Sequence, residues 1–208
     1  MTGNRLIYVH DPMCSWCWGF RPTLEVLIET LPDGLAFERL LGGLAPDSTV
    51  PMGAEMRAHL QQTWHRIQER IPGTRFNFAF WTDCEPRRST WPACRAVIAA
   101  RRCDPALEDT MIRAIQQAYY LQARNPSDDE TLIALAGEIG LDRGVFQGHL
   151  HDPQTQAELE QEMQRGQQMG ASSFPSLRLQ IGESIWPVAV DYTDAQAILR
   201  EINMLLTA

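Results

Sequence analysis

The ends of the chain show a different hydrophobic pattern from its middle. A short apolar and β-branched run at residues 5–10 predicts a buried strand, and apolar positions from Phe20 to Leu31 recur with helical spacing. A second run at 36–41, closed by two glycines, predicts another strand. Because strand, helix and strand follow one another directly, this segment predicts a βαβ unit with a parallel strand pair and a right-handed crossover.

From about residue 50 the pattern becomes helical. Thr90 is predicted to cap one of these helices, and a Ser127-to-Glu130 capping box to begin another. An aromatic stretch at 75–81 predicts either a strand or a loop under the core. The last helix of this block is very polar and is expected to lie mostly exposed. The predicted helices of the block span 52–71, 90–102, 105–123, 131–139, 142–150 and 153–169.

Strand character returns near the C-terminal end. Residues 176–181 and 184–190, separated by Gly-Glu, predict a hairpin. A second capping box at 193–196 opens a helix whose apolar face includes Ile198 and Ile202. The whole pattern, βαβ followed by a helical block and then ββα, predicts an α/β protein.

Composition narrows the class of protein. The 208 residues, 44% of them hydrophobic, suffice for one domain, or for one domain with a large insertion. The formal net charge of −8 disfavours binding to a phosphate backbone, so we expect no nucleic-acid partner. No apolar run is long enough to span a bilayer, and no membrane partner is expected. The N-terminal residues lack the basic and apolar pattern of a secretory leader, which favours a cytoplasmic location.

The sharpest local feature is a C-x-x-C motif, Cys14-Ser15-Trp16-Cys17, between the first predicted strand and helix. Two residues between cysteines at the start of a helix let the sulfurs meet as a disulfide. The first sulfur then lies beside the N–H groups of the first helical turn, which stabilise the nucleophilic thiolate. We therefore predict that Cys14 is the nucleophile and that Cys17, one turn further and more buried, resolves the mixed disulfide.

Other interpretations of the motif rest on the remaining cysteines. Five cysteines are few and odd in number, which argues against a structural disulfide framework in a reducing compartment. A zinc site would need two further ligands, and Cys84, Cys94 and Cys103 form no second C-x-x-C. The motif could also hold two inert buried thiols, but its place between a strand and a helix argues against this. We interpret the three other cysteines as small buried or surface thiols.

The chain resembles the DsbA-like branch of the thioredoxin superfamily over essentially its whole length. The resemblance rests on the order strand, C-x-x-C, proline-containing helix, strand, helical insertion and ββα. The stretch Asp11-Pro12-Met13-Cys14-Ser15-Trp16-Cys17 is similar to that of the cytosolic, FrnE-like members rather than the periplasmic oxidants. It implies an α/β thioredoxin-like fold with a large all-helical insertion. We expect a thioredoxin-like domain over residues 1–50 and 166–208 and an insertion domain over 51–165.

The resemblance also implies which residues form the site. In such proteins a cis-proline faces the active-site cysteines, and the segment 170–177 matches the sequence around it. Pro175 is therefore assigned as the cis-proline, with Phe174 before it. The residues expected to be catalytic are Cys14, Cys17 and Pro175, and those expected to bind the substrate are Trp16, Trp18 and Phe174.

The activity implied is that of a thiol–disulfide oxidoreductase or isomerase. Its partners would be substrate polypeptides or small-molecule thiols and disulfides. No metal or other cofactor is expected, although glutathione is a candidate co-substrate. The arginine pairs at 87–88 and 101–102 are interpreted as solvated faces, one of which could help to hold an acidic thiol. The sequence carries no signal for an oligomeric state.

One family feature is missing from this sequence. Many relatives carry a buried acid six residues before the first cysteine, where this chain has Tyr8. The group that takes the proton from the second cysteine therefore stays open at this point. His10, Asp11 and Glu25 are candidates by proximity alone.

Two alternative functions use the same architecture. Glutathione-dependent transferases and isomerases of the kappa-class type resemble it but carry serine at the first motif position, and Cys14 argues against this class. The other alternative is a thioredoxin-like metal-binding or adaptor module, in which the thiols would hold a metal or play no catalytic part.

Overall fold

The computed structural model describes residues 3–207. The chain contacts divide it into two compact units, one made of residues 1–42 and 162–208 and the other of residues 43–161. The division falls within α8 (Pro153–Gln168), which therefore contributes to both. We call them the sheet unit and the helical unit and describe each by itself.

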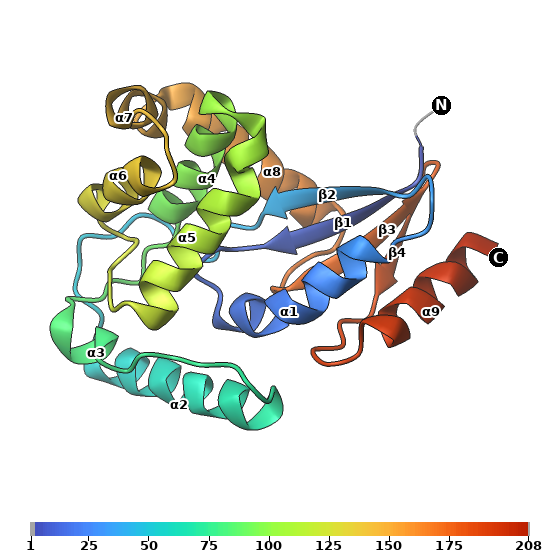
Figure 1. Cartoon of the computed structure of the whole chain (residues 1–208), viewed down its shortest axis with the longest axis horizontal. Helices are drawn as coiled ribbons and strands as arrows, with labels where there is room; N and C mark the ends of the chain where they lie inside the picture. Colours follow the sequence, from blue (N-terminus) through green and yellow to red (C-terminus); the bar gives the residue numbers. More distant parts are fainter. Residues whose placement is uncertain (1–2, 208) are drawn as a thin grey trace. The chain divides into compact units, whose positions relative to one another are not determined.

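The described part of the sheet unit contains a four-stranded sheet in the order β2-β1-β3-β4 (Figure 1). The strands β1 and β2 are parallel, whereas β3 pairs antiparallel with both β1 and β4. The predicted βαβ unit and hairpin are confirmed, with β4 two residues shorter than expected. The bounds are β1 Arg5–His10, β2 Ala36–Leu41, β3 Ser176–Ile181 and β4 Ser184–Val188.

Alternation along β1 separates the two faces of the sheet. Leu6 and Tyr8 point to a core shared with α1 (Ser15–Glu29) and α9 (Ala195–Thr207), the two helices that lie along one face in Figure 1. The intervening residues of β1 pack on the other face, in a cluster that includes Ala171 just after α8. Burying each large apolar side chain stabilises this arrangement by about 1.5–3 kcal/mol.

The exposed edge of the sheet at β2 is tied to the end of α8. Glu38 on β2 forms ion pairs with Arg5 at 3.0 Å and with Arg165 of α8. The backbone N–H of Leu41 donates to a carboxylate oxygen of Glu162, also on α8, over 2.7 Å. The bond to Glu162 satisfies one backbone N–H at an edge that would otherwise be open to further strand pairing.

The helical unit packs its helices around buried aromatic residues. Trp64 on α2 is fully buried, and rings from residues 76–81 and from α5 surround it. The stretch 75–81, predicted to be a strand or a loop, is a loop that leads into a short helix. The bounds are α2 Ala54–Arg70, α3 Phe80–Asp83, α4 Trp91–Cys103, a 3-10 turn Pro105–Leu107, α5 Glu108–Leu121, α6 Asp129–Glu138 and α7 Arg143–Leu150, followed by most of α8.

One predicted helix cap in the helical unit was wrong, and a second has the expected position but lacks the side-chain bond. The hydroxyl of Ser127 donates to the backbone carbonyl of Ser89 over 2.6 Å, and α6 begins at Asp129. Thr90 is the N-cap residue of α4, as predicted, but its Oγ1 accepts from the backbone N–H of Ala45 over 3.0 Å and makes no cap bond. Both hydroxyls therefore hold loops together because tertiary partners compete with the local backbone amides.

A third correction concerns the start of α9. The capping group is the carboxylate of Asp194, which accepts from the N–H groups of Gln196 and Ala197, and not the hydroxyl of Thr193. Thr193 instead bonds to the carboxylate of Asp191. Both residue types favour N-caps, and the backbone path after β4 selects the aspartate.

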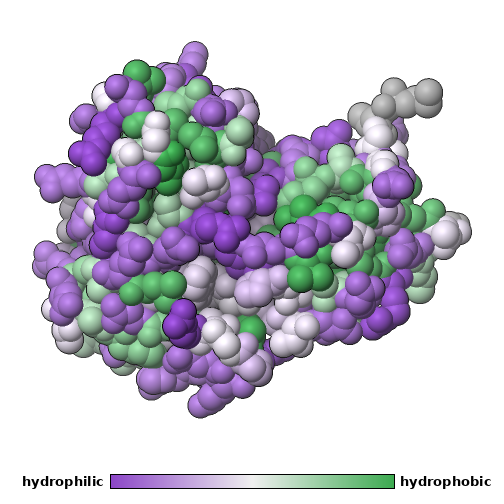
Figure 2. Space-filling model, viewed as in Figure 1, coloured by the Kyte–Doolittle hydropathy of each residue, from purple (hydrophilic) through white to green (hydrophobic). Residues whose placement is uncertain are grey.

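Figure 2 shows hydrophilic and hydrophobic residues interspersed over the visible side of the molecule. The large apolar side chains that stay exposed are scattered along the chain: Val26, Leu44, Val50, Met56, Val145, Trp186 and Met204. Scattered exposed apolar residues of this kind are normal for a folded protein. No helix in the described residues is long and apolar enough to cross a membrane.

Candidate functional site

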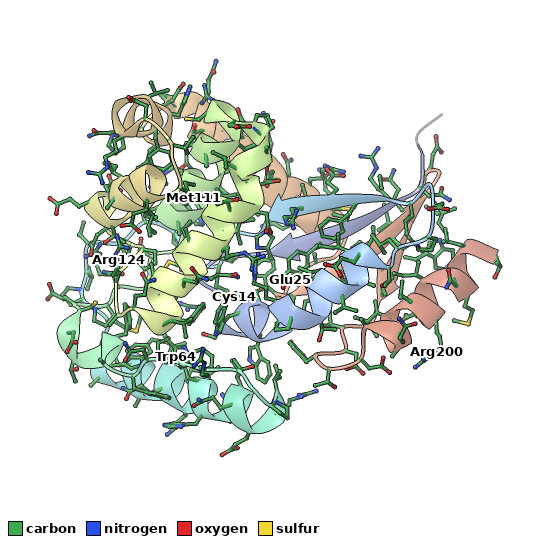
Figure 3. All side chains as sticks on the ribbon, in the orientation of Figure 1. Cys14, Glu25, Trp64, Met111, Arg124 and Arg200 are labelled. Carbon is green, nitrogen blue, oxygen red and sulfur yellow. The ribbon has the colours of Figure 1, made fainter. Side chains whose placement is uncertain are left out.

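A tight turn after β1 delivers the first cysteine to the start of α1. The N–H of Cys14 donates to the carbonyl of Asp11 over 3.0 Å, and the buried Asp11 carboxylate accepts from the N–H of Met13 over 2.8 Å. Cys14 is the N-cap residue of α1, and Figure 3 shows it at the beginning of that helix. The turn thus places the Cys14 sulfur at the end of the helix where backbone N–H groups lack intrahelical partners.

The segment before β3 approaches the same sulfur. The Phe174–Pro175 peptide bond is cis, as the resemblance implies, and Pro175 is buried. The Sγ of Cys14 lies 3.5 Å from the carbonyl oxygen of Phe174. The Phe174 ring packs on Gly42, directly after β2, where an added Cβ would overlap the ring. The site therefore combines a helix start, a strand end and a loop that lie far apart in the sequence.

The second cysteine lies in a dry environment one turn into α1. Cys17 is 1% exposed. Burial raises the pKa of its thiol well above the usual range, and the hydrogen bond with Cys14 and the charge of that neighbour raise it further. Hydrogen bonds from the backbone of Asp11 and from the side chain of Tyr8 act in the opposite direction. The Cys17 thiol is therefore protonated at neutral pH.

Sequence reasoning noted Tyr8 only as a missing acid, whereas the structure places its hydroxyl against Cys17. Burial raises the pKa of Tyr8 well above 10, and the two cysteines add to this shift, so the phenol stays protonated. The ring of Tyr8 stacks on that of His10 with centroids 4.8 Å apart. This contact depends on how β1 packs against α1. Hydrophobic periodicity along the chain does not predict that packing.

The three residues proposed as proton acceptors for Cys17 lie in different environments. His10 is buried and stacked on Tyr8, and Asp11 is engaged in the turn before Cys14. Glu25 is partly buried and forms an ion pair at 2.9 Å with the buried Arg21, which lies one helical turn before it. Arg21 lies close enough to Tyr8 for its positive charge to lower the pKa of that phenol.

Aromatic residues border the motif. Trp16 and Trp18 are both partly buried, and the Trp16 ring packs on Tyr192 with centroids 5.2 Å apart. Tyr192 also contacts Phe20 edge-on at 5.9 Å. No sequence pattern pointed to Tyr192, because it lies in the loop before α9 and only the folded sheet unit brings it to the motif.

The remaining cysteines belong to the helical unit. Cys94 is fully buried in α4, and the Sγ of Cys84 donates to the carbonyl of Ala123 over 3.0 Å. Burial raises the pKa of Cys84 and of Cys103, which makes both thiols less reactive. In the described residues no disulfide joins any of the five cysteines, and no group of three histidine, cysteine or acidic side chains is close enough to hold a metal ion.

Comparison with known proteins places the chain in a family. The DSBA-like thioredoxin domain matches residues 5–198, nearly the whole chain, and the chain belongs to this family. The predicted fold class, a thioredoxin-like α/β fold with a helical insertion, is confirmed.

Two solved structures illustrate the likeness. A protein from Nitrosomonas europaea, provisionally described as a protein disulfide isomerase, has a TM-score of 0.86 and 27% identity, with 99% of this chain and 98% of that one covered. The cytosolic disulfide reductase DsbM from Pseudomonas aeruginosa has a TM-score of 0.78 and 24% identity, with 98% of each chain covered. The second likeness shows the fold alone.

Curated sequences give a more distant match. The ClpXP adapter protein SpxH from Halalkalibacterium halodurans is 25% identical over 170 residues, and its counterpart from Bacillus subtilis is 23% identical over 168 residues. Each alignment covers 80% of this chain but 55% of the relative. The chain thus spans about half the length of the curated relatives that it matches.

Proposed function

We propose that this chain is a thiol–disulfide oxidoreductase or isomerase of the cytoplasm, which exchanges disulfides through Cys14 and Cys17. The observation that carries the proposal is the position of Cys14, at the start of α1 and 3.5 Å from the carbonyl of the residue before a cis-proline. The buried thiol of Cys17 one turn behind supplies the second sulfur. The family of the chain supports the general class of reaction.

In the reducing direction the chemistry has two steps. The Cys14 thiolate attacks one sulfur of a substrate disulfide, forms a mixed disulfide and expels the other substrate sulfur as a thiolate. Cys17 then loses its proton and attacks the Cys14 sulfur. This step forms the Cys14–Cys17 disulfide and releases the second substrate thiolate. The two protons of the reduced pair end on the two product thiols, so that atoms and electrons balance.

The groups around Cys17 favour its reaction after that of Cys14. Two of the influences that raise its pKa come from Cys14, namely a hydrogen bond and an electrostatic contribution. Both disappear when Cys14 is in a mixed disulfide, while the hydrogen bonds from Asp11 and Tyr8 remain. Attack by Cys14 therefore makes Cys17 easier to deprotonate. Cys17 stays protected until a substrate is attached.

The loop before β3 is the proposed docking edge for a substrate chain. Pro175 has no backbone N–H, and Ser172 and Ser173 before it are exposed. An extended substrate segment can pair with this backbone beside Cys14. We propose Trp16, Trp18 and Phe174 as the apolar contacts for the residues that flank the substrate disulfide.

The first test is a redox titration of the purified chain in glutathione buffers, with alkylation and mass mapping of each cysteine. We expect one reversible disulfide between Cys14 and Cys17. A potential of about −270 mV would indicate a reductant and one of about −120 mV an oxidant. A pair that stays alkylatable in every buffer would overturn the proposal.

Glutathione is the proposed small-molecule co-substrate. A structure of P. aeruginosa DsbM with GSH gives a TM-score of 0.75 against this chain, which supports testing it. We expect the oxidised Cys14–Cys17 pair to be reduced by glutathione through a mixed disulfide on Cys14. Mass spectrometry of acid-quenched samples would show this adduct, and a glutathione adduct only on Cys84 or Cys103 would contradict it.

A second candidate function is that of an adaptor, and the match to the ClpXP adapter proteins favours it. An adaptor binds its protease whether or not its cysteines react. The test is binding of the purified chain to ClpXP, compared with the Cys14→Ser variant. Equal, saturable binding by both would support an adaptor function, and no binding by either would rule it out.

A further inference from the structure

The most informative unassigned residue is Tyr8, which lies between the two layers of the sheet unit. It belongs to β1, opposite Arg39 on one neighbouring strand and Leu177 on the other. Its side chain is 3% exposed and belongs to the core cluster shared with α1 and α9. The strand thus holds the ring in one place.

Helix α1 presents one buried stripe to this ring. Cys17, Phe20 and Arg21 follow each other at helical spacing, and all three are buried. The rings of Tyr8 and Phe20 lie 6.0 Å apart, which fixes this stripe against β1. The Tyr8 hydroxyl forms a hydrogen bond with the sulfur of Cys17.

The direction of this hydrogen bond follows from the chemistry of its two partners. A thiolate has no proton to donate, whereas a buried phenol keeps its proton and can donate it. A donated O–H···S⁻ bond stabilises the charged form of sulfur and is strengthened by the low dielectric around it. The positive charge of Arg21, held by its ion pair with Glu25, polarises the same hydroxyl.

We propose that Tyr8 is a catalytic residue of the resolving step: its hydroxyl donates a hydrogen bond to Cys17 Sγ and stabilises the thiolate that attacks the mixed disulfide. Tyr8 carries no proton away. The proton of Cys17 ends on the departing substrate thiolate, while the phenol keeps its own. This inference rests on the proposed thiol–disulfide exchange.

The test separates the two steps in a single turnover. Reduced protein is mixed with an aromatic disulfide whose thiolate product absorbs visible light, so that each sulfur attack releases one coloured thiolate. The three cysteines of the helical unit are first replaced (Cys84→Ser, Cys94→Ala, Cys103→Ser) to leave only the motif. In the Tyr8→Phe variant we expect an unchanged first release and a second release slower by on the order of tenfold, with the mixed disulfide accumulating.

Two controls distinguish this role from a structural one. Tyr8→Phe keeps the ring that packs on His10 and Phe20, so the fold is retained. Tyr120→Phe removes another buried phenol hydroxyl, from the helical unit, and is expected to leave both releases unchanged. A second release at the parental rate in Tyr8→Phe, or the same slowing in Tyr120→Phe, would overturn the proposal.

A titration gives a readout that does not depend on activity. With Cys14 replaced by alanine, the ultraviolet absorbance of the thiolate reports the ionisation of Cys17. Tyr8→Phe is expected to raise the pKa of Cys17, with His10, Asp11 and Arg21 left in place as the other titratable or charged groups near it. An unchanged or lowered pKa would overturn the proposal. If the parental protein releases no coloured thiolate, the proposed function fails and the role of Tyr8 in the resolving step fails with it, whereas a normal release with an unchanged Cys17 pKa overturns the role of Tyr8 alone.

Discussion

The two compact units bury polar side chains for different purposes. In the sheet unit they gather at one place: His10, Asp11 and Arg21 are buried close to the C-x-x-C motif, with Tyr8 against Cys17. In the helical unit they are spread over helices, as at Thr63, Gln116 and Thr155, and over loops. There the buried hydroxyls of Ser89, Thr90 and Ser127 form hydrogen bonds with the backbone of distant segments.

The cysteines show the same contrast. Cys14 and Cys17 share a motif and influence each other electrostatically, whereas Cys94 and Cys103 lie nine residues apart on α4 and Cys84 lies just after α3. A cysteine can take part in disulfide exchange only where a second cysteine and hydrogen-bond donors to the thiolate lie nearby and a substrate can reach the sulfur. From this difference we expect the proposed sulfur chemistry to reside in the sheet unit, and the buried polar groups of the helical unit to serve the fold.

The largest expected effect comes from removing the proposed nucleophile. Cys14→Ser should lower the rate of disulfide exchange by several orders of magnitude, because serine forms no comparable nucleophile at neutral pH. Cys103→Ser, in the helical unit, should leave the rate unchanged. Reduction of a fluorescent peptide disulfide would measure both. An equal loss of exchange rate in the two variants would mean that disulfide exchange does not depend on the sheet unit alone.

The aromatic core of the helical unit should matter for stability and not for sulfur chemistry. Trp64→Ala removes a fully buried ring and should lower the free energy of unfolding by about 3–5 kcal/mol. Chemical denaturation would measure the loss. The glutathione potential of the Cys14–Cys17 pair should not change at temperatures where the variant is folded, and a shifted potential would contradict the comparison.

The close packing of Phe174 on Gly42 provides a finer test within the sheet unit. Gly42→Ala places a methyl group where the ring lies, so the loop before Pro175 must move. We expect a loss of about 1–3 kcal/mol in stability and slower exchange with peptide disulfides.

A second glycine variant supplies the control for this test. Gly148 is an exposed position in α7 with open space around it, and Gly148→Ala should stabilise the protein by about 0.5–1 kcal/mol without affecting exchange. If Gly42→Ala exchanged peptide disulfides as fast as Gly148→Ala, the packing of Phe174 would have no part in the site.

The smallest effect concerns the ion pairs of Glu38. Burial alone would raise the pKa of this carboxyl, but its hydrogen bonds and ion pairs with Arg165 and Arg5 outweigh burial and lower it. Because the pKa is lower in the folded state than in the unfolded chain, the stabilisation is full above the ordinary carboxyl pKa. It is lost as the pH falls through the lowered value.

Glu38→Gln should therefore cost about 0.5–1 kcal/mol at neutral pH, with the difference from the parental protein shrinking in acid. Denaturation midpoints measured from neutral pH into the acid range would show this convergence. A difference that stays constant across the range would mean that the ion pairs contribute nothing that depends on the charge of Glu38.

Strand positions were predictable because each depends on a local pattern. The runs at 5–10, 36–41 and 176–181 are strands with the expected bounds, since short apolar runs between turn residues have few other ways to bury themselves. Helix caps were less predictable. Ser127 and Thr90 have the residue type of a cap, but distant backbone groups take their hydroxyls.

The candidate site divides in the same way. The sequence by itself determined the C-x-x-C motif, its place between a strand and a helix and, through the resemblance, Pro175 as the cis-proline, because these depend on neighbours along the chain. Only the tertiary structure decided that Phe174 reaches Cys14, that its ring needs Gly42, and that Tyr8 meets Cys17. Such contacts join segments that are brought together by sheet pairing and helix packing, and the geometry of these interactions is not encoded in any local stretch of residues.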